Sequence, residues 1–238
     1  MINARRLITR YLPQVRLRIV DLYAVESFSQ EGEDLILRRI FGDRKQGFYI
    51  DVGAHHPRRF SNTHFFYLQG WHGINIEPSP DAISRFRKER PRDVNLQTAI
   101  SDTPAKLAYH VFDEPALNTF DATLARSRLE HTGYRLLQKI EVQVVRLDAV
   151  LDVNLPPSTT IDFMSIDVEG FDFKVVRSND WSKYRPRCLL VEALESDLER
   201  AMSGELHQFM VKQNYTLFAK TYNTLFYMDK LTSGPNIR

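Results

Sequence analysis

The stretch Phe48–Pro57, FYIDVGAHHP, begins as an apolar run, stops at Asp51, turns on Gly53 and then places two histidines side by side. A short apolar run bounded by a glycine is typical of a buried strand in a parallel sheet. In open α/β sheets, ligands bind beyond the carboxyl ends of the strands. We therefore interpret this stretch as the corner of a sheet where a nucleotide-like cofactor binds.

Short apolar runs and segments with helical spacing alternate along most of the chain. A first helix is expected at 27–42, with Ser29 as its N-cap and Gly42 just past its end. This alternation predicts a parallel sheet covered by helices, with right-handed crossovers. Further strands are expected at 47–54, 72–78, 94–101, 106–112, 140–147, 161–170 and 187–194, further helices at 61–71, 79–91, 171–181 and 197–213, and an antiparallel hairpin at 215–229.

The segment 113–138 is polar and has weak periodicity. We interpret it as an excursion over the top of the sheet, of the kind that forms caps or lids in compact domains. Four aromatic side chains in or near this segment and the closing hairpin are candidates for stacking on a sugar face, although core packing explains aromatics equally well: Phe112, Phe120, Tyr134 and Tyr222.

Length and composition fit one α/β domain over residues 27–238. The chain has 238 residues, and its net charge of +2 argues against a dedicated nucleic-acid-binding protein, which would need a strong basic excess. Its one cysteine, Cys188, lies in an apolar run and is expected to be a buried small hydrophobe. No apolar stretch approaches the ~18 residues of a membrane span, and no signal-peptide pattern is visible, so we expect a cytoplasmic protein.

Residues 1–26 form an arginine-rich lead that we expect to be a helical extension. Its arginines alternate with Leu, Ile and Val, so a basic amphipathic helix could lie on an anionic membrane surface, although Pro13 interrupts it. Packing on the domain or on a second subunit, as in a homodimer, is the alternative that we favour over peripheral membrane contact.

Polar residues follow most of the expected strands, where a ligand would bind. Glu77 is the most informative, because an acidic side chain at the end of the second strand can accept hydrogen bonds from both hydroxyls of a ribose. The turn at Gly53 and Ala54 lets a ligand approach the backbone, but it lacks the full G-x-G-x-x-G phosphate cradle. A cofactor with a ribose and no pyrophosphate fits better, and S-adenosylmethionine (SAM) is one.

Three separated motifs resemble the FkbM family of SAM-dependent methyltransferases: FSQEGEDLIL, the stretch from Phe48 to Pro80, and MSIDVEGFDFKVVRS. The resemblance runs from Ser27 to about Phe226. It implies a Rossmann-like class I methyltransferase fold, with a mostly parallel seven-stranded sheet, helices on both faces and an antiparallel final strand. It also implies O-methyl transfer to a hydroxyl of a sugar, glycan or natural-product acceptor.

The same resemblance implies a set of cofactor-binding residues. Asp51, Gly53, Ala54 and His55 would line the methionine part of SAM, and Glu77 would bind the ribose. The remaining expected contacts are Pro78 beside Glu77, Ser101 and Asp102 near the adenine, and Gln30, Asn62, Thr63 and Asp167 at the border of the pocket.

Structural roles remain open for several of these residues. Asp51 could cap the turn that follows it, Glu77 could be a solvated strand end, and Asn62 or Thr63 could cap a helix. His55 and His56 are adjacent, so their side chains point apart and a shared metal ion is not expected. We expect Asp172 and Lys174 to lie on a solvated helix face.

The acceptor hydroxyl must lose its proton, and the sequence leaves two solutions open. Asp167, Glu169 and Glu192 could hold Mg²⁺, which prefers carboxylate oxygens and lowers the pKa of a bound hydroxyl. Alternatively, Asp167, Glu169, His55 or His56 could act as a general base without a metal. A nicotinamide-binding oxidoreductase of Rossmann type and a SAM-fold protein that binds without catalysis are the alternative functions.

Overall fold

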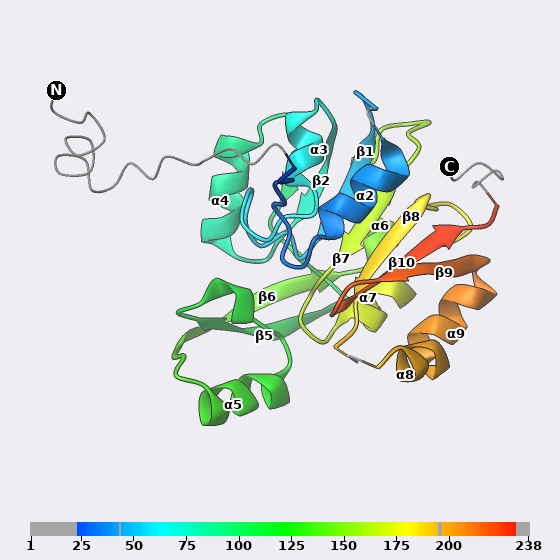
Figure 1. The fold of residues 1–238 in the computed structure, drawn as a ribbon. Coiled ribbons are helices and arrows are strands. Elements are labelled where there is room, and N and C mark those ends of the chain that lie inside the picture. The colour runs from blue at the N-terminus through cyan, green and yellow to red at the C-terminus, as the bar shows by residue number, and fades with distance from the viewer. Residues whose placement is uncertain (1–22, 43, 195–196, 232–238) are drawn as a thin grey trace, which may run out of the picture.

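The computed structural model describes residues 23–42, 44–194 and 197–231. Its main sheet has seven strands: β1 Phe48–Val52, β2 His72–Ile76, β3 Val94–Leu96, β7 Phe163–Ile166, β8 Cys188–Glu192, β9 Tyr215–Lys220 and β10 Thr224–Asp229. They follow the order β3-β2-β1-β7-β8-β10-β9 (Figure 1). The first five in that order are parallel, and β10 is antiparallel to both β8 and β9. The predicted mostly parallel seven-stranded sheet with a reversed final strand is confirmed.

The register of the central strands brings their carboxyl ends to one level. Val52 at the end of β1 pairs with Ile76 of β2 on one side and with Ile166 of β7 on the other. Gly53 and Asp167, the next residues, continue this pairing through backbone hydrogen bonds to Ile76 O and Val52 O. The polar residues that follow β1, β2 and β7 therefore meet at one edge of the sheet.

The central strands are buried on both faces because helices cover both. Ile50 and Val52 face a core cluster that includes residues of α6 (Leu147–Asn154), α7 (Asp172–Arg177) and α9 (Glu205–Lys212). Tyr49 faces a second cluster with residues of α2 (Glu33–Phe41) and α3 (His64–Leu68). Cys188 is fully buried in this second cluster, as its apolar surroundings predicted.

Several element ends differ from the sequence prediction. Helix α2 begins at Glu33 rather than after Ser29, because Gly32 adopts a left-handed conformation at φ 88° and Ser29 bonds instead to the Asp34 carboxylate at 2.9 Å. Helix α4 (Pro80–Glu89) begins with Ser79 as its N-cap. The helix expected at 197–213 is two helices, α8 (Leu198–Ser203) and α9. They are separated at Gly204, which adopts an extended, non-helical conformation.

The strand expected at 94–101 is split between two sheets. Residues 94–96 form β3 of the main sheet, and Ala99–Ile100 form β4 of a three-stranded sheet with order β4-β6-β5. The other two strands are β5 (Ala105–Phe112) and β6 (Leu136–Val145). The split redirects the chain away from the main sheet at residues 97–98.

The segment 113–138 has more regular structure than its polarity suggested. It contains the 3₁₀ turn η1 (Pro115–Leu117), helix α5 (Ala122–His131) and the first residues of β6. Asp121 caps α5 by accepting the N–H groups of Thr123 and Leu124. Together α5, β5 and β6 form a lobe beside the main sheet (Figure 1). We call residues 105–145 the lobe, and a lid role for it stays a prediction.

The arginine-rich lead falls mainly outside the described residues. Residues 1–22 of the expected helical extension are not described, and residues 23–26 are exposed and not helical. Within the ranges that the structure describes, none of the helices combines the length and the apolar character that crossing a membrane requires.

Candidate functional site

A cavity lies between the carboxyl ends of β1, β2 and β7 and the lobe. Its volume is about 890 Å³ when the space open to solvent is included. We call it the main cavity. Its lining comes from the turn after β1, the end of β2, the start of β4, the loop after β7 and the lobe, and it includes Gln30, Asp51–His55, Phe60, Asn62, Ile76–Pro78, Thr98–Ile100, Tyr109, Pro115, Ala116, Asn118, Phe120, Ser165, Asp167–Glu169 and Phe171.

The carboxylates of Asp51 and Glu77 both line the main cavity, as the strand-end argument predicts. Asp51 Oδ2 accepts the hydroxyl of Thr63 at 2.8 Å, and Glu77 accepts the backbone N–H groups of His55 at 2.9 Å and Ser79 at 2.8 Å. Burial raises the pKa of Asp51 to about 6 and that of Glu77 to about 7. Near neutral pH each carboxyl group can therefore lose its proton, and the ionised form can accept a hydrogen bond from a ligand.

The turn after β1 is shaped by Gly53. Its φ is +80°, and a Cβ there would lie 1.7 Å from the carbonyl oxygen of Asp167. The sequence suggested that this glycine lets a ligand approach the backbone. In the structure, the space that a side chain would fill is taken by the Asp167 backbone, so the glycine allows close contact between the ends of β1 and β7. His55 also has a left-handed φ, of 53°. A non-glycine residue in that region stores strain, a feature that clusters at functional sites.

The two histidines after this turn have different surroundings. His55 lines the main cavity and stacks on Phe60, with ring centroids 6.2 Å apart. Its Nε2 is buried and finds no hydrogen-bond partner among the described residues, and burial together with Arg59 lowers the pKa of His55 to about 4. His56 is outside the cavity lining, and its Nδ1 accepts the N–H groups of Arg58 and Arg59. The two rings therefore do not converge on one ion.

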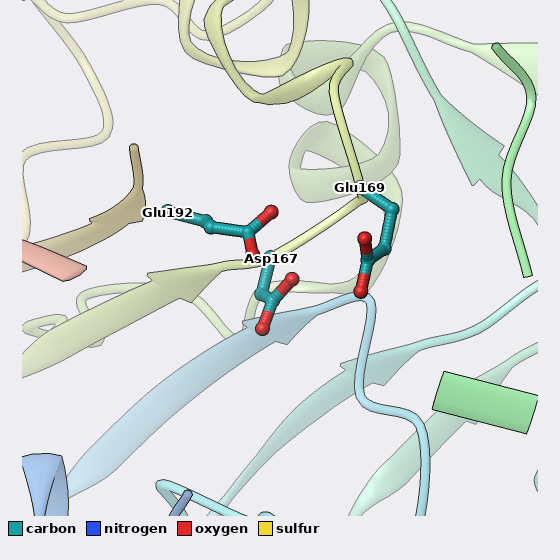
Figure 2. Close-up of side chains that lie close together, drawn as sticks. All are labelled: Asp167, Glu169 and Glu192. Atoms are coloured by element: carbon teal, nitrogen blue, oxygen red, sulfur yellow. The ribbon is translucent and has the colours of Figure 1, made fainter. Parts of the chain in front are cut away.

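Three carboxylates from the ends of β7 and β8 turn toward one another: Asp167, Glu169 and Glu192 (Figure 2). One oxygen from each lies within 4.8 Å of the others. The Asp167 side chain faces the open space of the cavity, and the surrounding protein replaces much of its bulk water. This desolvation and the neighbouring carboxyl groups raise the pKa of Asp167 well above its usual range. Burial raises the pKa of Glu169 and Glu192 as well. Such a cluster can hold either protons or a cation.

The loop that carries Glu169 is held by Asp172 and by Arg128 of α5. Glu169 and Gly170 have φ values of 55° and 97°. Asp172 accepts the N–H groups of Val168 at 2.9 Å and Gly170 at 3.0 Å, and Arg128 forms an ion pair with the Glu169 carboxylate. Asp172 is thus buried, which corrects the expectation of a solvated helix face, whereas Lys174 is exposed as expected.

The other predicted cofactor contacts divide into two groups. Gln30, Asn62 and Pro78 line the main cavity, and Asn62 Nδ2 donates to Ser165 Oγ at 3.0 Å. Thr63 lies behind Asp51, to which it donates its hydroxyl, while the guanidinium of Arg90 donates to Thr63 at 2.6 Å.

Ser101 and Asp102 lie outside the main-cavity lining. Asp102 forms an ion pair with Arg177 at 2.8 Å, and Ser101 is buried, with its backbone N–H donating to the carbonyl of Val145 at the end of β6. Thr98, Ala99 and Ile100 line the cavity in their place. The early end of β3 explains the difference, because Leu96 pairs with Ile76 at the carboxyl end of β2, so residues 98–100 follow the strand end where residues 101 and 102 were expected.

A second, smaller cavity adjoins the main one. We call it the annex, and its volume is about 320 Å³. It shares four residues with the main cavity, and its full lining is Gln30, Glu31, Glu33, Phe60, Asn62, Asp167, Glu192, Asn223 and Thr224. The site residues that sequence reasoning missed include Glu31 and Glu33, which looked like ordinary first-turn acids of a helix.

Ser165, Tyr109 and Asn118 were also missed as lining residues of the main cavity. Ser165 carried a signal that could have found it, since it lies two residues before Asp167 in an otherwise apolar strand. The lobe residues Tyr109 and Asn118 had none, because their position depends on how the lobe folds back. Of the aromatics proposed for stacking, Phe120 lines the cavity, whereas Phe112 is buried and Tyr134 and Tyr222 are exposed elsewhere.

Comparison with known proteins gives one family. A family model described as the methyltransferase FkbM domain matches residues 51–217. Among solved structures, a methyltransferase FkbM from Methylobacillus flagellatus KT is similar, with a TM-score of 0.49 and 13% sequence identity over 84% of this chain. This chain covers 48% of the length of that protein. No curated protein matches the sequence.

Proposed function

The chain belongs to the FkbM methyltransferase family, and from this premise we propose that it transfers a methyl group from SAM to a hydroxyl of a sugar, glycan or natural-product acceptor. One observation carries the proposal. The carboxylates of Asp51 and Glu77, from adjacent strand ends, line the same cavity. This is the arrangement that a ribose-containing cofactor requires at the edge of a parallel sheet.

The charge of the main cavity supports a cofactor without phosphate groups. Its described lining contains four carboxylates, those of Asp51, Glu77, Asp167 and Glu169, and neither lysine nor arginine. SAM carries a positive sulfonium and an ammonium group, so this lining suits it. The pyrophosphate of a nicotinamide dinucleotide would find no lysine or arginine there to balance its charge. The reversed strand β10 also departs from the strand order 3-2-1-4-5-6 of the dinucleotide-binding fold.

Separate parts of the cavity would hold separate parts of the cofactor. Glu77 would accept the ribose hydroxyls, the turn Asp51–His55 would border the methionine part, and the apolar residues Ile76 and Ile100 would flank the adenine. SAM, when bound, supplies a methyl carbon made electrophilic by the positive sulfur. The lobe residues Tyr109 and Phe120 would keep water from this carbon, since both line the same cavity.

Asp167 is the best placed of the four predicted catalytic residues to take the acceptor proton. It borders both the main cavity and the annex, whereas His55 and Glu169 border only the main cavity and His56 borders neither. An acceptor hydroxyl between the two cavities would lie within reach of its carboxylate. Desolvation and the neighbouring carboxyl groups raise the pKa of Asp167, so its ionised form is a stronger base than an isolated aspartate.

A divalent cation on Asp167, Glu169 and Glu192 is the competing way to activate the hydroxyl. Three convergent carboxylate oxygens suit Mg²⁺, which would take the place of the protons that the cluster holds. Exhaustive chelation with EDTA during turnover separates the two mechanisms. Undiminished formation of S-adenosylhomocysteine, the product that SAM leaves after methyl transfer, would support Asp167 as a base without a metal. Loss of turnover that Mg²⁺ restores would support the mechanism with a cation.

Calorimetric titration with S-adenosylhomocysteine (SAH) and with NAD tests the proposed function itself. We expect SAH to bind, and Asp51→Asn to weaken SAH binding while Asp81→Asn, an exposed acid on α4, does not. Binding of NAD with no heat from SAH would replace the proposal with a nicotinamide enzyme. Binding of SAH by a protein that methylates none of a broad set of hydroxyl acceptors would favour a SAM-binding protein without catalysis.

A further inference from the structure

We propose that the annex is the acceptor subsite, and that it selects a hydroxyl-rich acceptor that is neutral or carries a protonated amine and has no anionic group next to the reacting hydroxyl. This inference rests on the proposed methyl transfer and adds the substrate class. It follows from the position of the annex, from the direction of the hydrogen-bonding groups in its wall, and from its charge.

The annex adjoins the main cavity on the side away from β2, toward β8 and β10. The residues common to both linings are Gln30, Phe60, Asn62 and Asp167. Asp51 and Glu77, the proposed cofactor ligands, line only the main cavity, and Glu192 and Thr224 line only the annex. A cofactor held by the first pair therefore leaves the annex free, with Asp167 at the boundary between the two spaces.

The wall of the annex is fixed by hydrogen bonds between distant parts of the chain. Glu31 Oε2 accepts the backbone N–H of Asn223 at 2.8 Å. Glu33 Oε1 accepts the hydroxyls of Thr221 at 3.2 Å and Thr224 at 3.3 Å. The segment before α2 and the turn between β9 and β10 therefore form one rigid wall, as a preorganised binding site requires.

One acceptor oxygen in this wall has no partner. Glu192 Oε2 is buried and makes no hydrogen bond with any of the described residues. Glu192 pairs with Thr224 in the ladder between β8 and β10, so its side chain stands beside the turn that closes the annex. A buried oxygen without a partner is costly, and a ligand that donates a hydrogen bond or carries a positive charge would relieve that cost.

The charge of the annex decides which ligands it can hold. The described lining contributes four carboxyl groups, those of Glu31, Glu33, Asp167 and Glu192, and no lysine or arginine. A hydroxyl or an ammonium group can donate to these oxygens. A carboxylate or phosphate on the ligand would lie beside the carboxylates of Glu31 and Glu33 without a compensating cation, which costs far more in a partly buried cavity than in water.

The reaction at this boundary balances with the groups already named. A lone pair of the acceptor oxygen attacks the methyl carbon, the bond between carbon and sulfur breaks, and its electron pair stays on sulfur to give neutral SAH. The acceptor proton passes to the carboxylate of Asp167. The acceptor thus needs its hydroxyl at the boundary and the rest of its ring in the annex.

Much of the annex comes from chain outside the family match. Gln30, Glu31 and Glu33 precede residue 51, and Asn223 and Thr224 follow residue 217, whereas Asp51 and Glu77 lie inside the matched range. The surface that would contact the cofactor is thus part of the matched domain, and much of the proposed acceptor surface is added by the flanking segments. This division is expected in a family whose members share a cofactor and differ in the acceptor.

The test uses the full chain loaded with SAH and three probes that differ in charge: methyl glucosaminide, methyl glucoside and methyl glucuronide. Binding is followed by NMR titration, with the amide signals of Asn223 and Thr224 as reporters. We expect affinity to fall from the amine to the neutral sugar to the acid, by about tenfold from first to last. Glu192→Gln and Glu31→Gln should each reduce this ratio, whereas Glu205→Gln, at the exposed start of α9, should not.

Each outcome decides the proposal. The expected order in the wild type, flattened in both annex variants while SAH affinity is unchanged, supports it. Equal or tighter binding of the glucuronide overturns it, as does an order that persists in both variants. Failure of every probe to shift the reporter amides at concentrations up to roughly 100 mM, far above a millimolar Kd, also overturns it. Failure of SAH itself to bind would instead overturn the proposed function.

Discussion

Gly53 and Asp167 touch at the tips of two neighbouring strands, where a Cβ on the glycine would lie 1.7 Å from the aspartate carbonyl oxygen. This contact joins the turn that borders the proposed cofactor site to the loop that carries the proposed base. The relative position of the two sites therefore depends on a residue that has no side chain.

Replacing this glycine should unfold or distort the site. Gly53→Ala combines a left-handed φ of +80° with a clash against backbone atoms, which cannot move aside as a flexible side chain could. We expect a loss of about 3 kcal/mol or more in the free energy of unfolding, measured by urea denaturation. Gly133→Ala is the control, because nothing lies within 4 Å of its Cβ position. Equal stability of the two variants would contradict the packing described for Gly53.

Glu77 should make the protein without cofactor less stable as the pH rises. Burial raises its pKa from 4.5 to about 7, so the folded protein keeps a proton that the unfolded chain releases. This contribution is fully present below pH 4.5 and is lost as the pH rises toward 7, by an amount on the order of 3 kcal/mol. Unfolding measured at pH 5.5 and pH 8 should show a smaller difference for Glu77→Gln than for the wild type.

The exposed Glu141, which pairs with Lys106 at 3.0 Å, provides the control for this measurement. Glu141→Gln should keep the pH dependence of the wild type. Asp51, with a pKa of about 6, contributes in the same direction and remains in both variants. A pH dependence that Glu77→Gln leaves unchanged would show that the Glu77 carboxyl is already ionised at pH 5.5.

Asp167 should be required for the chemical step and not for cofactor binding. General base catalysis contributes roughly 10²- to 10⁴-fold, so Asp167→Asn should lower kcat by a factor in that range. SAH affinity should change little, because the amide keeps the shape of the side chain. His56→Ala should retain most of the activity, since His56 lies outside the main-cavity lining. SAH formation with an acceptor that the wild type methylates is the measurement, and the reverse ranking would move the base to the histidine.

Arg128 should hold the lobe against the loop after β7. Its guanidinium forms the ion pair with Glu169 and also donates to the carbonyl of Leu117 at 2.6 Å. Arg128→Ala should raise hydrogen-exchange rates in residues 113–138 by about tenfold or more, because a hydrogen-bonded charge pair is lost. Arg126→Ala, on the exposed side of the same helix, should leave these rates unchanged. Equal exchange in the two variants would show that other contacts hold the lobe.

The central strands and the strand-end acids could be predicted from the sequence because local patterns determine them. Asp51 and Glu77 follow short apolar runs, and parallel strands must bring their carboxyl ends to one edge. The closing hairpin was equally legible, with Tyr222 and Asn223 between two runs of apolar residues. Each of these predictions needed only the period of a strand and the residue at its end.

Other features depended on contacts between distant residues. Helix α5 buries Ala125 alone, so its sequence shows no apolar stripe. Asp172 looks like a solvated helix residue and is buried because the N–H groups of Val168 and Gly170 turn toward it. The annex was hidden for the same reason, since Glu31 and Asn223 meet across 192 positions of the chain.

The reversed direction of β10 places the turn before it at the same edge as the ends of β7 and β8. Residues 221–223 form a short connection at the surface, and such connections tolerate changes in length and composition well. Substitutions, insertions or deletions in this turn could therefore change the acceptor during evolution while the proposed cofactor site stayed the same. A graft of the turn from a relative would be a compact route to an enzyme of altered substrate range.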